Sequence, residues 1–234
     1  MNINLKILPY LLTSLWETEY SKGGIPSSVR QKPSGAVERL VKSLGLEKMS
    51  NLKGVDIGCG TGRNAIYLSE LGCNMLAIDF ISSAVESLQM RKQRLGITNL
   101  ATQIVHLTKN WSLPSSDYNL FIDTYCFFHI IKLADRLHYK SELIKHAASN
   151  SIFLLTLAST EDGYYKQHII REDNDLQVAL DPGNNIECVL YTKEQIIKFF
   201  SPEFKIIDLC VNTQSNIMHG ITYKRKGYEC LFTL

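Results

Sequence analysis

The stretch that decides the fold is VDIGCGTGR at residues 55–63, in which three glycines follow a short apolar run at alternate positions. Glycine loses more conformational entropy on folding than other residues, so such a cluster indicates a sharp turn or a close approach to the backbone. The apolar segment LKGVDIG has the character of a strand, and RNAIYLSEL after the loop is predicted to be a helix. Strand, glycine loop and helix in this order predict a site for a nucleotide-like ligand.

The spacing of these glycines indicates which kind of ligand the loop holds. Dinucleotide-binding loops read G-x-G-x-x-G, so that a pyrophosphate can rest on the N-terminus of the helix. Here the third glycine, Gly62, comes two residues after Gly60, and the residue three after Gly60 is Arg63. The sequence also lacks the phosphate-binding pattern G-x-x-x-x-G-K-[ST]. We therefore expect no phosphate cradle.

The segment VDIGCGTGRNAIYLSELG, followed by LAIDF, resembles the first two motifs of class I S-adenosylmethionine-dependent methyltransferases. GCGTGRNAIYL is especially similar to the tellurite-resistance and thiopurine branch of that family. The order of elements extends the resemblance over residues 36–234, although the specific motifs span only residues 55–80. The resemblance implies that the loop lies under the methionine part of S-adenosylmethionine. The loop residues assigned to the cofactor on this basis are Asp56, Gly58, Cys59, Gly60 and Gly62.

The resemblance also implies that the acid ending the second strand holds the ribose hydroxyls of the cofactor. This acid is Asp79, 17 residues after Gly62, and its carboxylate can accept both hydroxyls. Phe80 offers an apolar face to the adenine. Asp56 either orients the loop or receives the cofactor's ammonium group through water, and the alternative is that it caps a buried turn.

The sequence departs from the family after the third strand. Many members carry an acidic residue there that meets the adenine amino group, whereas this chain has HLTKNWSLP. Asn110 is the candidate for that hydrogen bond, and Trp111 is the candidate for a stacking surface. A tryptophan buried in the core is the alternative.

The segment IDTYCFFHI comes after the fourth strand. The resemblance implies that this segment faces the transferring methyl group. We assign Asp123 to the cofactor site and Tyr125 to the substrate side. His129 is the candidate base or acceptor-orienting group, because an imidazole titrates near neutral pH. The alternative is a core histidine. No metal-ligand spacing, no GxSxG elbow and no N/D-P-P-Y/F motif occurs.

Two segments do not fit the strand and helix alternation, and both are predicted to be lids. Residues 1–35 form a cap in which Trp16 and Tyr20, four residues apart, share a helical face over the cofactor, and a simple packing helix is the alternative. Arg30 is expected to pair with a carboxylate of the cofactor or of an acidic acceptor. The second segment is a long insertion loop at about residues 159–190. Its Tyr164 and Tyr165 are the candidates on the substrate side.

The composition restricts the class of protein. The 234 residues carry a net charge of +2, with no basic run longer than YKRK, so a nucleic-acid partner is not expected. The six cysteines show no CxxC spacing, which favours reduced thiols in the cytoplasm. No apolar run is long enough to span a membrane, and NLKILPYLLTSLW is predicted to be an amphipathic helix and not a targeting segment.

Apolar strands alternate with helices along residues 36–234, which predicts a doubly wound α/β fold with a mostly parallel sheet. The resemblance implies seven strands, and FKIIDLCV and GYECLFTL are expected to form an antiparallel pair at the C-terminus. Ligands in such sheets bind at the carboxyl ends of the strands, where the glycine loop lies.

We therefore expect an S-adenosylmethionine-dependent methyltransferase that transfers a methyl group to a small molecule by in-line displacement. Two alternatives stay open. One is a peptide or protein acceptor that docks on the insertion, and the other is a domain that binds the cofactor without catalysis. The identity of the acceptor and the oligomeric state do not follow from the sequence.

Overall fold

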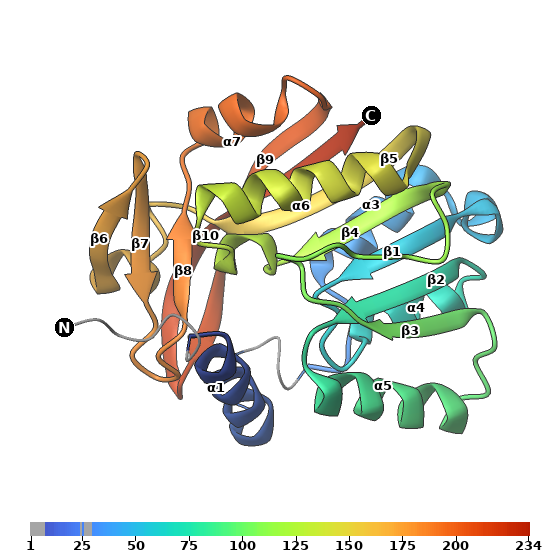
Figure 1. Cartoon of the computed structure of the whole chain (residues 1–234), viewed down its shortest axis with the longest axis horizontal. Helices are drawn as coiled ribbons and strands as arrows, with labels where there is room; N and C mark the ends of the chain where they lie inside the picture. The colour runs from blue at the N-terminus through green and yellow to red at the C-terminus, as the bar shows by residue number, and fades with distance from the viewer. Residues whose placement is uncertain (1–7, 24, 26–29) are drawn as a thin grey trace.

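A seven-stranded sheet in the order β3-β2-β1-β4-β5-β10-β9 forms the centre of the molecule (Figure 1). The structure is a computed structural model, and it describes residues 8–23, 25 and 30–234. The strands of this sheet are β1 (Lys53–Ile57), β2 (Asn74–Asp79), β3 (Leu100–Ile104), β4 (Tyr118–Thr124), β5 (Ala147–Ala158), β9 (Lys205–Met218) and β10 (Ile221–Thr233). β1 to β5 are parallel to their neighbours, and β10 runs antiparallel to both β5 and β9. The predicted fold class and the antiparallel C-terminal pair are confirmed.

Helices cover both faces of the sheet. One face packs against α3 (Gly35–Leu44), α4 (Arg63–Glu70) and α5 (Ser82–Arg94), and the other packs against α6 (Leu133–His146) and α7 (Lys193–Phe200). Side chains alternate between the faces along each strand, as the pleat requires. Ile57 and Phe121 therefore pack with α6, whereas Ile122 packs with α3 and α4. Three short 3₁₀ helices complete the list: η1 (Leu46–Asn51), η2 (Phe127–His129) and η3 (Tyr165–His168).

Side-chain caps begin two of these helices. Ser34 caps α3, because its hydroxyl accepts a hydrogen bond from the N–H of Val37. Thr192 and Gln195 form a reciprocal capping box at the start of α7. Both caps satisfy backbone donors that the first turn of a helix leaves without partners.

The predicted loop at residues 159–190 is wrong as a description of secondary structure. The insertion folds into a separate antiparallel sheet of β6 (Ile169–Asp173), β7 (Leu176–Leu180) and β8 (Glu187–Leu190). Asn174 and Asp175 join β6 to β7 with positive φ angles of 49° and 62°, and such residues suit a two-residue hairpin turn. The dipeptide is the signal from which this hairpin could have been predicted.

The hairpin of β9 and β10 extends beyond the sheet. Only residues 227–233 of β10 pair with β5, so the part of the hairpin between Asn212 and Lys226 continues past the end of that strand. It meets the insertion through a buried ion pair, in which Arg225 Nε lies 2.8 Å from Asp162 Oδ2. The exposed fractions of these two residues are 9% and 1%. Asp162 also accepts the N–H groups of Tyr164 and Tyr165, so one carboxylate fixes the insertion to the hairpin.

The N-terminal helix α1 (Leu8–Lys22) lies at the carboxyl ends of the parallel strands, together with the insertion (Figure 1). No helix in the described part of the chain is both long enough and apolar enough to cross a membrane.

The substitution Arg225→Met tests the buried pair. It leaves the Asp162 carboxylate buried without its cation, so we expect the free energy of unfolding to fall by about 3–5 kcal/mol. Denaturant titration measures this change. The matched control is Lys224→Met at the exposed neighbouring position, which should stay within about 0.5 kcal/mol of the wild type. Equal, small losses in both variants would contradict the assigned role of the pair.

Candidate active site

The glycine loop between β1 and α4 is tightly packed against its surroundings. Gly58, Gly60 and Gly62 all have positive φ angles, of 64°, 53° and 81°. A Cβ atom on Gly60 would lie 2.7 Å from the hydroxyl oxygen of Tyr20, which comes from α1. At Gly58 the Cβ would collide with the thiol of Cys126, and at Gly62 it would collide with Leu88 of α5. Only glycine therefore fits all three positions.

Asp79 at the end of β2 joins the two sequence motifs. Its Oδ2 accepts the N–H of Gly60 at 2.8 Å, and its Oδ1 accepts the N–H of Ile81 at 3.0 Å. These bonds hold the loop after β1 against the end of β2. Each carboxylate oxygen can accept a second hydrogen bond, so Asp79 keeps acceptor capacity for hydroxyl groups of a ligand. Phe80 follows directly, and its ring centroid lies 5.4 Å from that of His106.

Three buried carboxylates gather at the ends of β1, β2 and β4. Asp56 accepts the N–H of Ala65 at 3.1 Å, and burial raises its pKa to about 7, with smaller contributions from the charges of Asp123 and Asp79. Burial also raises the pKa of Asp79 and brings the pKa of Asp123 to about 6. The buried surroundings therefore disfavour the ionised form of all three carboxyl groups.

The assignment of Asp123 to the cofactor is wrong in its detail. Its carboxylate is fully buried and accepts the N–H groups of Cys126 and Phe127 together with the hydroxyl of Tyr139. Both oxygens are occupied by these donors, so none remains for a ligand. Asp123 instead positions the turn that carries Cys126 and η2 into the site.

His129 is half-buried at the end of η2. Its Nδ1 lies 2.9 Å from the backbone oxygen of Glu187. Because a carbonyl only accepts, Nδ1 carries the proton, and Nε2 therefore carries the lone pair. Burial lowers the pKa of His129 to about 4. The ring is thus neutral at physiological pH, whereas an unperturbed imidazole titrates near neutrality.

The helix α1 covers the loop and His129 together. The Trp16 ring stands edge-on to the His129 ring, with 5.0 Å between centroids, and lies 6.0 Å from the Tyr20 ring. The buried Glu19 accepts the backbone N–H of Ile25 and the side-chain N–H of Asn184 in the insertion. Burial raises the pKa of the Tyr20 hydroxyl, and the nearby Asp79 raises it further. The predicted face of Trp16 and Tyr20 therefore lies where the cap hypothesis requires it.

Three other predicted residues serve the core. Trp111 is 1% exposed, donates from Nε1 to the backbone oxygen of Leu107 and packs edge-on against Tyr139. Tyr164 donates its hydroxyl to Asp181, and Tyr165 lies under the guanidinium of Arg225. All three side chains are buried and contact other core residues, an arrangement that does not support the stacking role predicted for Trp111 or the substrate role predicted for the two tyrosines.

The remaining predicted residues lie near the surface. Arg30 is exposed and donates to the side-chain oxygen of Asn216 on β9, at 2.7 Å. Asn110 is exposed beyond the end of β3. Tyr125 is half-buried and has a positive φ of 64°, which is uncommon for a residue with a large side chain. It lies directly after β4, the strand that separates β1 from β5 in the sheet.

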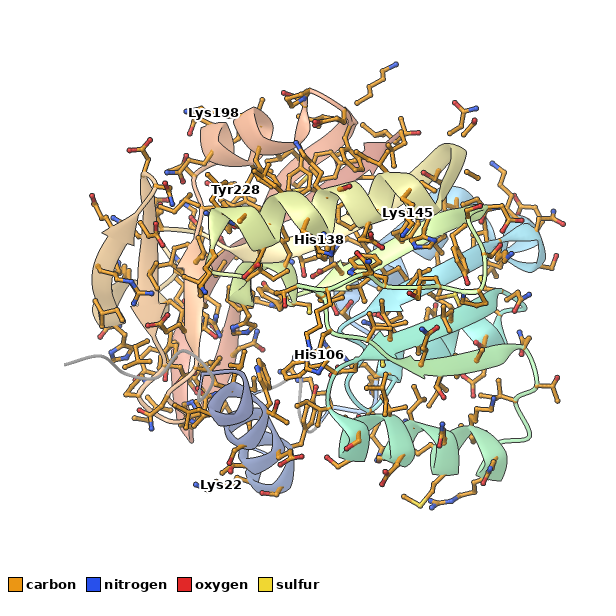
Figure 2. The ribbon with its side chains drawn as sticks, in the orientation of Figure 1. Lys22, His106, His138, Lys145, Lys198 and Tyr228 are labelled. Atoms are coloured by element: carbon orange, nitrogen blue, oxygen red, sulfur yellow. The ribbon has the colours of Figure 1, made fainter. Side chains whose placement is uncertain are left out.

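Two residues near the loop escaped the sequence analysis. His106, rather than Trp111, lies beside Phe80 at the carboxyl ends of β2 and β3 (Figure 2). Arg63 is half-buried at the first position of α4, and no hydrogen bond or ion pair to it occurs in the described part of the chain. Burial lowers its pKa, and the charge of Arg30 adds to this. A cation at the positive end of a helix is unfavourable. The position of Arg63 directly after the third glycine is the sequence signal from which its place in the site could have been predicted.

The described residues contain no group of three histidine, cysteine, aspartate or glutamate side chains arranged to hold a metal ion. The site consists of the glycine loop, the Asp79 carboxylate, which can accept further hydrogen bonds, and the aromatic rings of α1. This cradle fits the S-adenosyl cofactor that the motifs imply, since the loop admits close approach and Asp79 can accept a pair of hydroxyls.

Comparisons with known proteins agree with this reading. The model of the family described as "Tellurite resistance protein TehB" matches residues 40–162, more than half of the chain. A curated relative, the 2-heptyl-1-hydroxyquinolin-4(1H)-one methyltransferase of Mycobacteroides abscessus, is 22% identical over 147 residues, which are 62% of this chain and 63% of the relative. The chain spans less than two thirds of the length of the curated relatives it matches.

Solved structures share the fold. One is 1,6-didemethyltoxoflavin-N1-methyltransferase from Burkholderia thailandensis, solved with bound 1,6-didemethyltoxoflavin and S-adenosylhomocysteine. It is 13% identical, with a TM-score of 0.66, and the match covers 100% of this chain and 91% of that one. TehB from Haemophilus influenzae is 16% identical, with a TM-score of 0.63, over 86% of this chain and 62% of that one. At such low identity these likenesses establish the fold alone.

The buried carboxylate of Asp56 predicts a pH-dependent stability. Its pKa in the folded protein, about 7, exceeds its ordinary value of 3.8, so folding favours the protonated acid. The stability gained from this preference is present below about pH 4 and is lost as the pH rises to about 7. Asp56→Asn keeps an acceptor for the Ala65 N–H but cannot ionise, so it should lose less. We expect the difference between the two proteins to grow by up to about 1.4 kcal/mol per pH unit in this interval.

Denaturant titrations at several pH values between 4 and 8 measure this difference. Asp175→Asn, at an exposed position, is the matched control and should follow the wild-type profile. A difference between Asp56→Asn and the wild type that stays constant with pH would contradict the buried-charge interpretation.

Proposed function

This chain belongs to the tellurite resistance protein TehB family, and on that premise we propose that it is an S-adenosylmethionine-dependent methyltransferase with a small-molecule acceptor. The observation that carries the proposal is the hydrogen bond from the Gly60 N–H to the Asp79 carboxylate. It unites a glycine loop that permits close approach with an acid that can accept ribose hydroxyls. A dinucleotide site would need a different glycine spacing.

We assign the cofactor's ribose to Asp79 and its adenine to the space beside Phe80 and His106. When bound, S-adenosylmethionine supplies a methyl group already activated by its sulfonium charge. The chain's own task is then alignment and exclusion of water. Trp16 and Tyr20 provide aromatic faces that favour a nearby cation, and Asp56 fixes the first turn of α4 through the Ala65 N–H.

The helix α1 acts as the cover of this site. The Tyr20 hydroxyl lies against Gly60, so α1 must shift before a ligand can lie on the loop. Glu19 and Asn184 link α1 to the insertion, which gives the two predicted lids a common movement. Residues 1–35 as a cap and residues 36–234 as the catalytic domain remain our proposed division of the chain.

His129 orients the acceptor in this proposal. Its Nδ1 is held by the Glu187 carbonyl, and its neutral Nε2 can accept a hydrogen bond from a hydroxyl or an amine. A pKa of about 4 makes the ring a weak base. Its main contribution is therefore to accept a hydrogen bond from the acceptor and so to position the lone pair that attacks the methyl group.

Small molecules as acceptors are supported by two proteins similar to this chain. The names of these proteins state that one acts on 2-heptyl-1-hydroxyquinolin-4(1H)-one and the other on 1,6-didemethyltoxoflavin.

The absence of disulfides among the six cysteines supports a reducing, cytoplasmic location.

Calorimetric titration with S-adenosylmethionine, S-adenosylhomocysteine and NAD tests the proposed cofactor. We expect both adenosyl compounds to bind and NAD not to bind. A radiolabelled methyl-transfer assay with the two molecules named above then tests the acceptor class. Failure of both adenosyl compounds to bind would overturn the proposal.

The variant Asp79→Asn removes the carboxylate that we assign to the ribose and that also accepts the N–H groups of Gly60 and Ile81. One acceptor oxygen is replaced by a donor, so we expect the affinity for S-adenosylhomocysteine to fall about 10- to 100-fold, as for a lost hydrogen bond to a charged group. Adenosine, which keeps the ribose, should lose the same factor in the same calorimetric assay. Asp175→Asn again serves as the matched control. An unchanged affinity for either compound would refute the ribose assignment.

The variant His129→Asn separates orientation from binding. Asparagine can still donate to the Glu187 carbonyl but places no ring nitrogen toward the acceptor. On an acceptor that the wild type methylates, we expect kcat to fall about 100-fold, with the affinity for S-adenosylhomocysteine within about twofold. His168→Asn, in η3, is the matched control. Equal turnover in His129→Asn and the wild type would leave His129 a core residue.

A further inference from the structure

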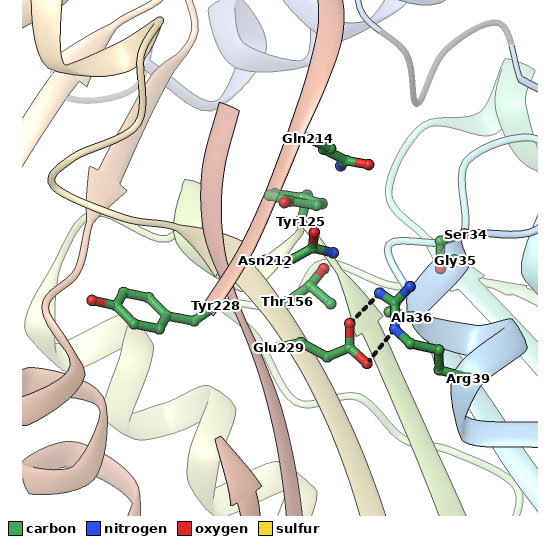
Figure 3. Close-up of a pocket in the computed structure, with 10 residues that line it drawn as sticks. All are labelled: Ser34, Gly35, Ala36, Arg39, Tyr125, Thr156, Asn212, Gln214, Tyr228 and Glu229. Carbon is green, nitrogen blue, oxygen red and sulfur yellow. Dashed lines mark hydrogen bonds and ion pairs between the residues drawn. The ribbon is translucent and has the colours of Figure 1, made fainter. Parts of the chain in front are cut away.

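A small cavity of about 100 Å³ opens at the N-terminus of α3 (Figure 3). Its walls come from the start of α3, the turn after β4, the end of β5 and the hairpin of β9 and β10. Figure 3 shows Thr156 at the wall of this space, with its hydroxyl directed toward the side of Asn212. Neither the cofactor assignment nor His129 uses any of these groups.

The register of the sheet places the cavity relative to the cofactor site. Ile57, the last residue of β1, pairs with Asp123 of β4, so the next row across the sheet contains Gly58 and Thr124. Thr124 pairs with Thr156 of β5, which pairs with Glu229 of β10. The cavity is therefore level with the glycine loop and two strands beyond it, or about 10 Å away. Asp79 lies one strand beyond the loop in the opposite direction.

The cavity is rich in hydrogen-bond donors that have no acceptor. Thr156 is 4% exposed, and its Oγ1 has no hydrogen-bond partner. In α3 the Ser34 side chain caps only Val37, and the N–H groups of Gly35 and Ala36 find no acceptor among the described residues. A buried polar group without a partner costs free energy. The donors of a helix N-terminus, together with a buried hydroxyl, form a site that an anion would satisfy.

The charges around the cavity limit the size of that anion. Glu229 lies at the wall, but both of its oxygens are bound by the guanidinium of Arg39. One negative charge therefore suits the site, whereas a dianion would be repelled by Glu229. The volume suits a planar group of three or four atoms.

We propose that this cavity is a subsite for a carboxylate of the acceptor, held by the N–H groups of Gly35 and Ala36 and by the hydroxyl of Thr156. The inference rests on the proposed methyltransferase function and names the class of its substrate, a small molecule with a carboxylate. The place of the cavity, on the far side of the glycine loop from Asp79, separates it from the adenosine part of the cofactor. The alternative occupant of this subsite is the carboxylate of the cofactor's own methionine part.

Acetate is the probe for the subsite, with acetamide as its neutral counterpart. Each is titrated at constant ionic strength into the full chain, with and without S-adenosylhomocysteine, while the amide signals of Gly35 and Ala36 are followed by NMR. We expect a saturable shift of these two signals with acetate, and at least tenfold weaker binding of acetamide. Shifts no larger than those of exposed amides elsewhere would overturn the proposal.

Two variants remove one donor each. Thr156→Val keeps the shape and deletes the hydroxyl, and should weaken acetate binding at least fivefold. Gly35→Pro deletes a backbone donor at the first position of α3, where proline is well tolerated and Ser34 already has the extended φ and ψ that precede proline. It should fold as stably as the wild type and also weaken acetate binding. Thr222→Val, on the exposed part of β10, is the matched control and should bind acetate normally. Unchanged acetate affinity in both test variants would overturn the assignment.

The source of the carboxylate is decided by comparing S-adenosylhomocysteine with 5′-methylthioadenosine, which lacks the amino-acid part. We expect Thr156→Val to bind both as the wild type does, and acetate to bind the complex with S-adenosylhomocysteine. If Thr156→Val weakens only S-adenosylhomocysteine, or if that ligand excludes acetate, the subsite belongs to the cofactor and the proposal fails. If the wild type binds neither adenosyl compound, the proposed function fails and with it this acceptor subsite. Acetate binding to the free protein would then still reveal an anion site, but one of another function.

Discussion

The hydrogen bond from the Gly60 N–H to the Asp79 carboxylate is the contact on which the site depends. It connects two residues 19 positions apart and holds the loop after β1 against the end of β2. The same carboxylate accepts the Ile81 N–H, so it also starts the turn into α5. Burial raises the pKa of Asp79, whereas the hydrogen bonds from Ile81 and Gly60 lower it. Buried carboxyl groups with shifted pKa values are common where binding or catalysis sets the requirement.

The same conflict between burial and charge recurs around the loop. Asp56 has its pKa raised to about 7 by burial, whereas Arg63, nearby, has its pKa lowered. Asp123 resolves the conflict differently, because it accepts hydrogen bonds from two backbone N–H groups and one hydroxyl of its own chain. Groups whose hydrogen-bonding capacity is fully used (saturated) thus lie beside groups that keep free capacity (unsaturated). The saturated ones set the geometry, and the unsaturated ones are available to ligands.

Local patterns in the sequence predicted the alternating strands and helices of the parallel sheet and the glycine loop, because each of these elements depends on residues close together in the chain. The assignment of Gly60 and Asp79 to one cofactor site followed from a family resemblance, whereas the hydrogen bond between them is a finding of the structure. The sequence failed where long-range packing decides the outcome. Trp111 looked like a stacking surface, but Tyr139 of α6 buries it. Tyr164 and Tyr165 looked like substrate contacts, but Arg225, sixty residues later, holds them in the core. Thr156, an ordinary strand residue by its pattern, acquires meaning only from the start of α3 above it.

The three segments outside the regular alternation enclose the site together. Asp162 and Arg225 fix the insertion to the hairpin, and Glu19 with Asn184 fixes α1 to the insertion. α1 also reaches the loop through Tyr20 and reaches His129 through Trp16. A shift of α1 would therefore change the contacts at the glycine loop and at His129 together, because one helix contacts both. Such coupling excludes water only when both ligands are small enough to be covered, and this is the physical reason for preferring a compact acceptor over a protein chain.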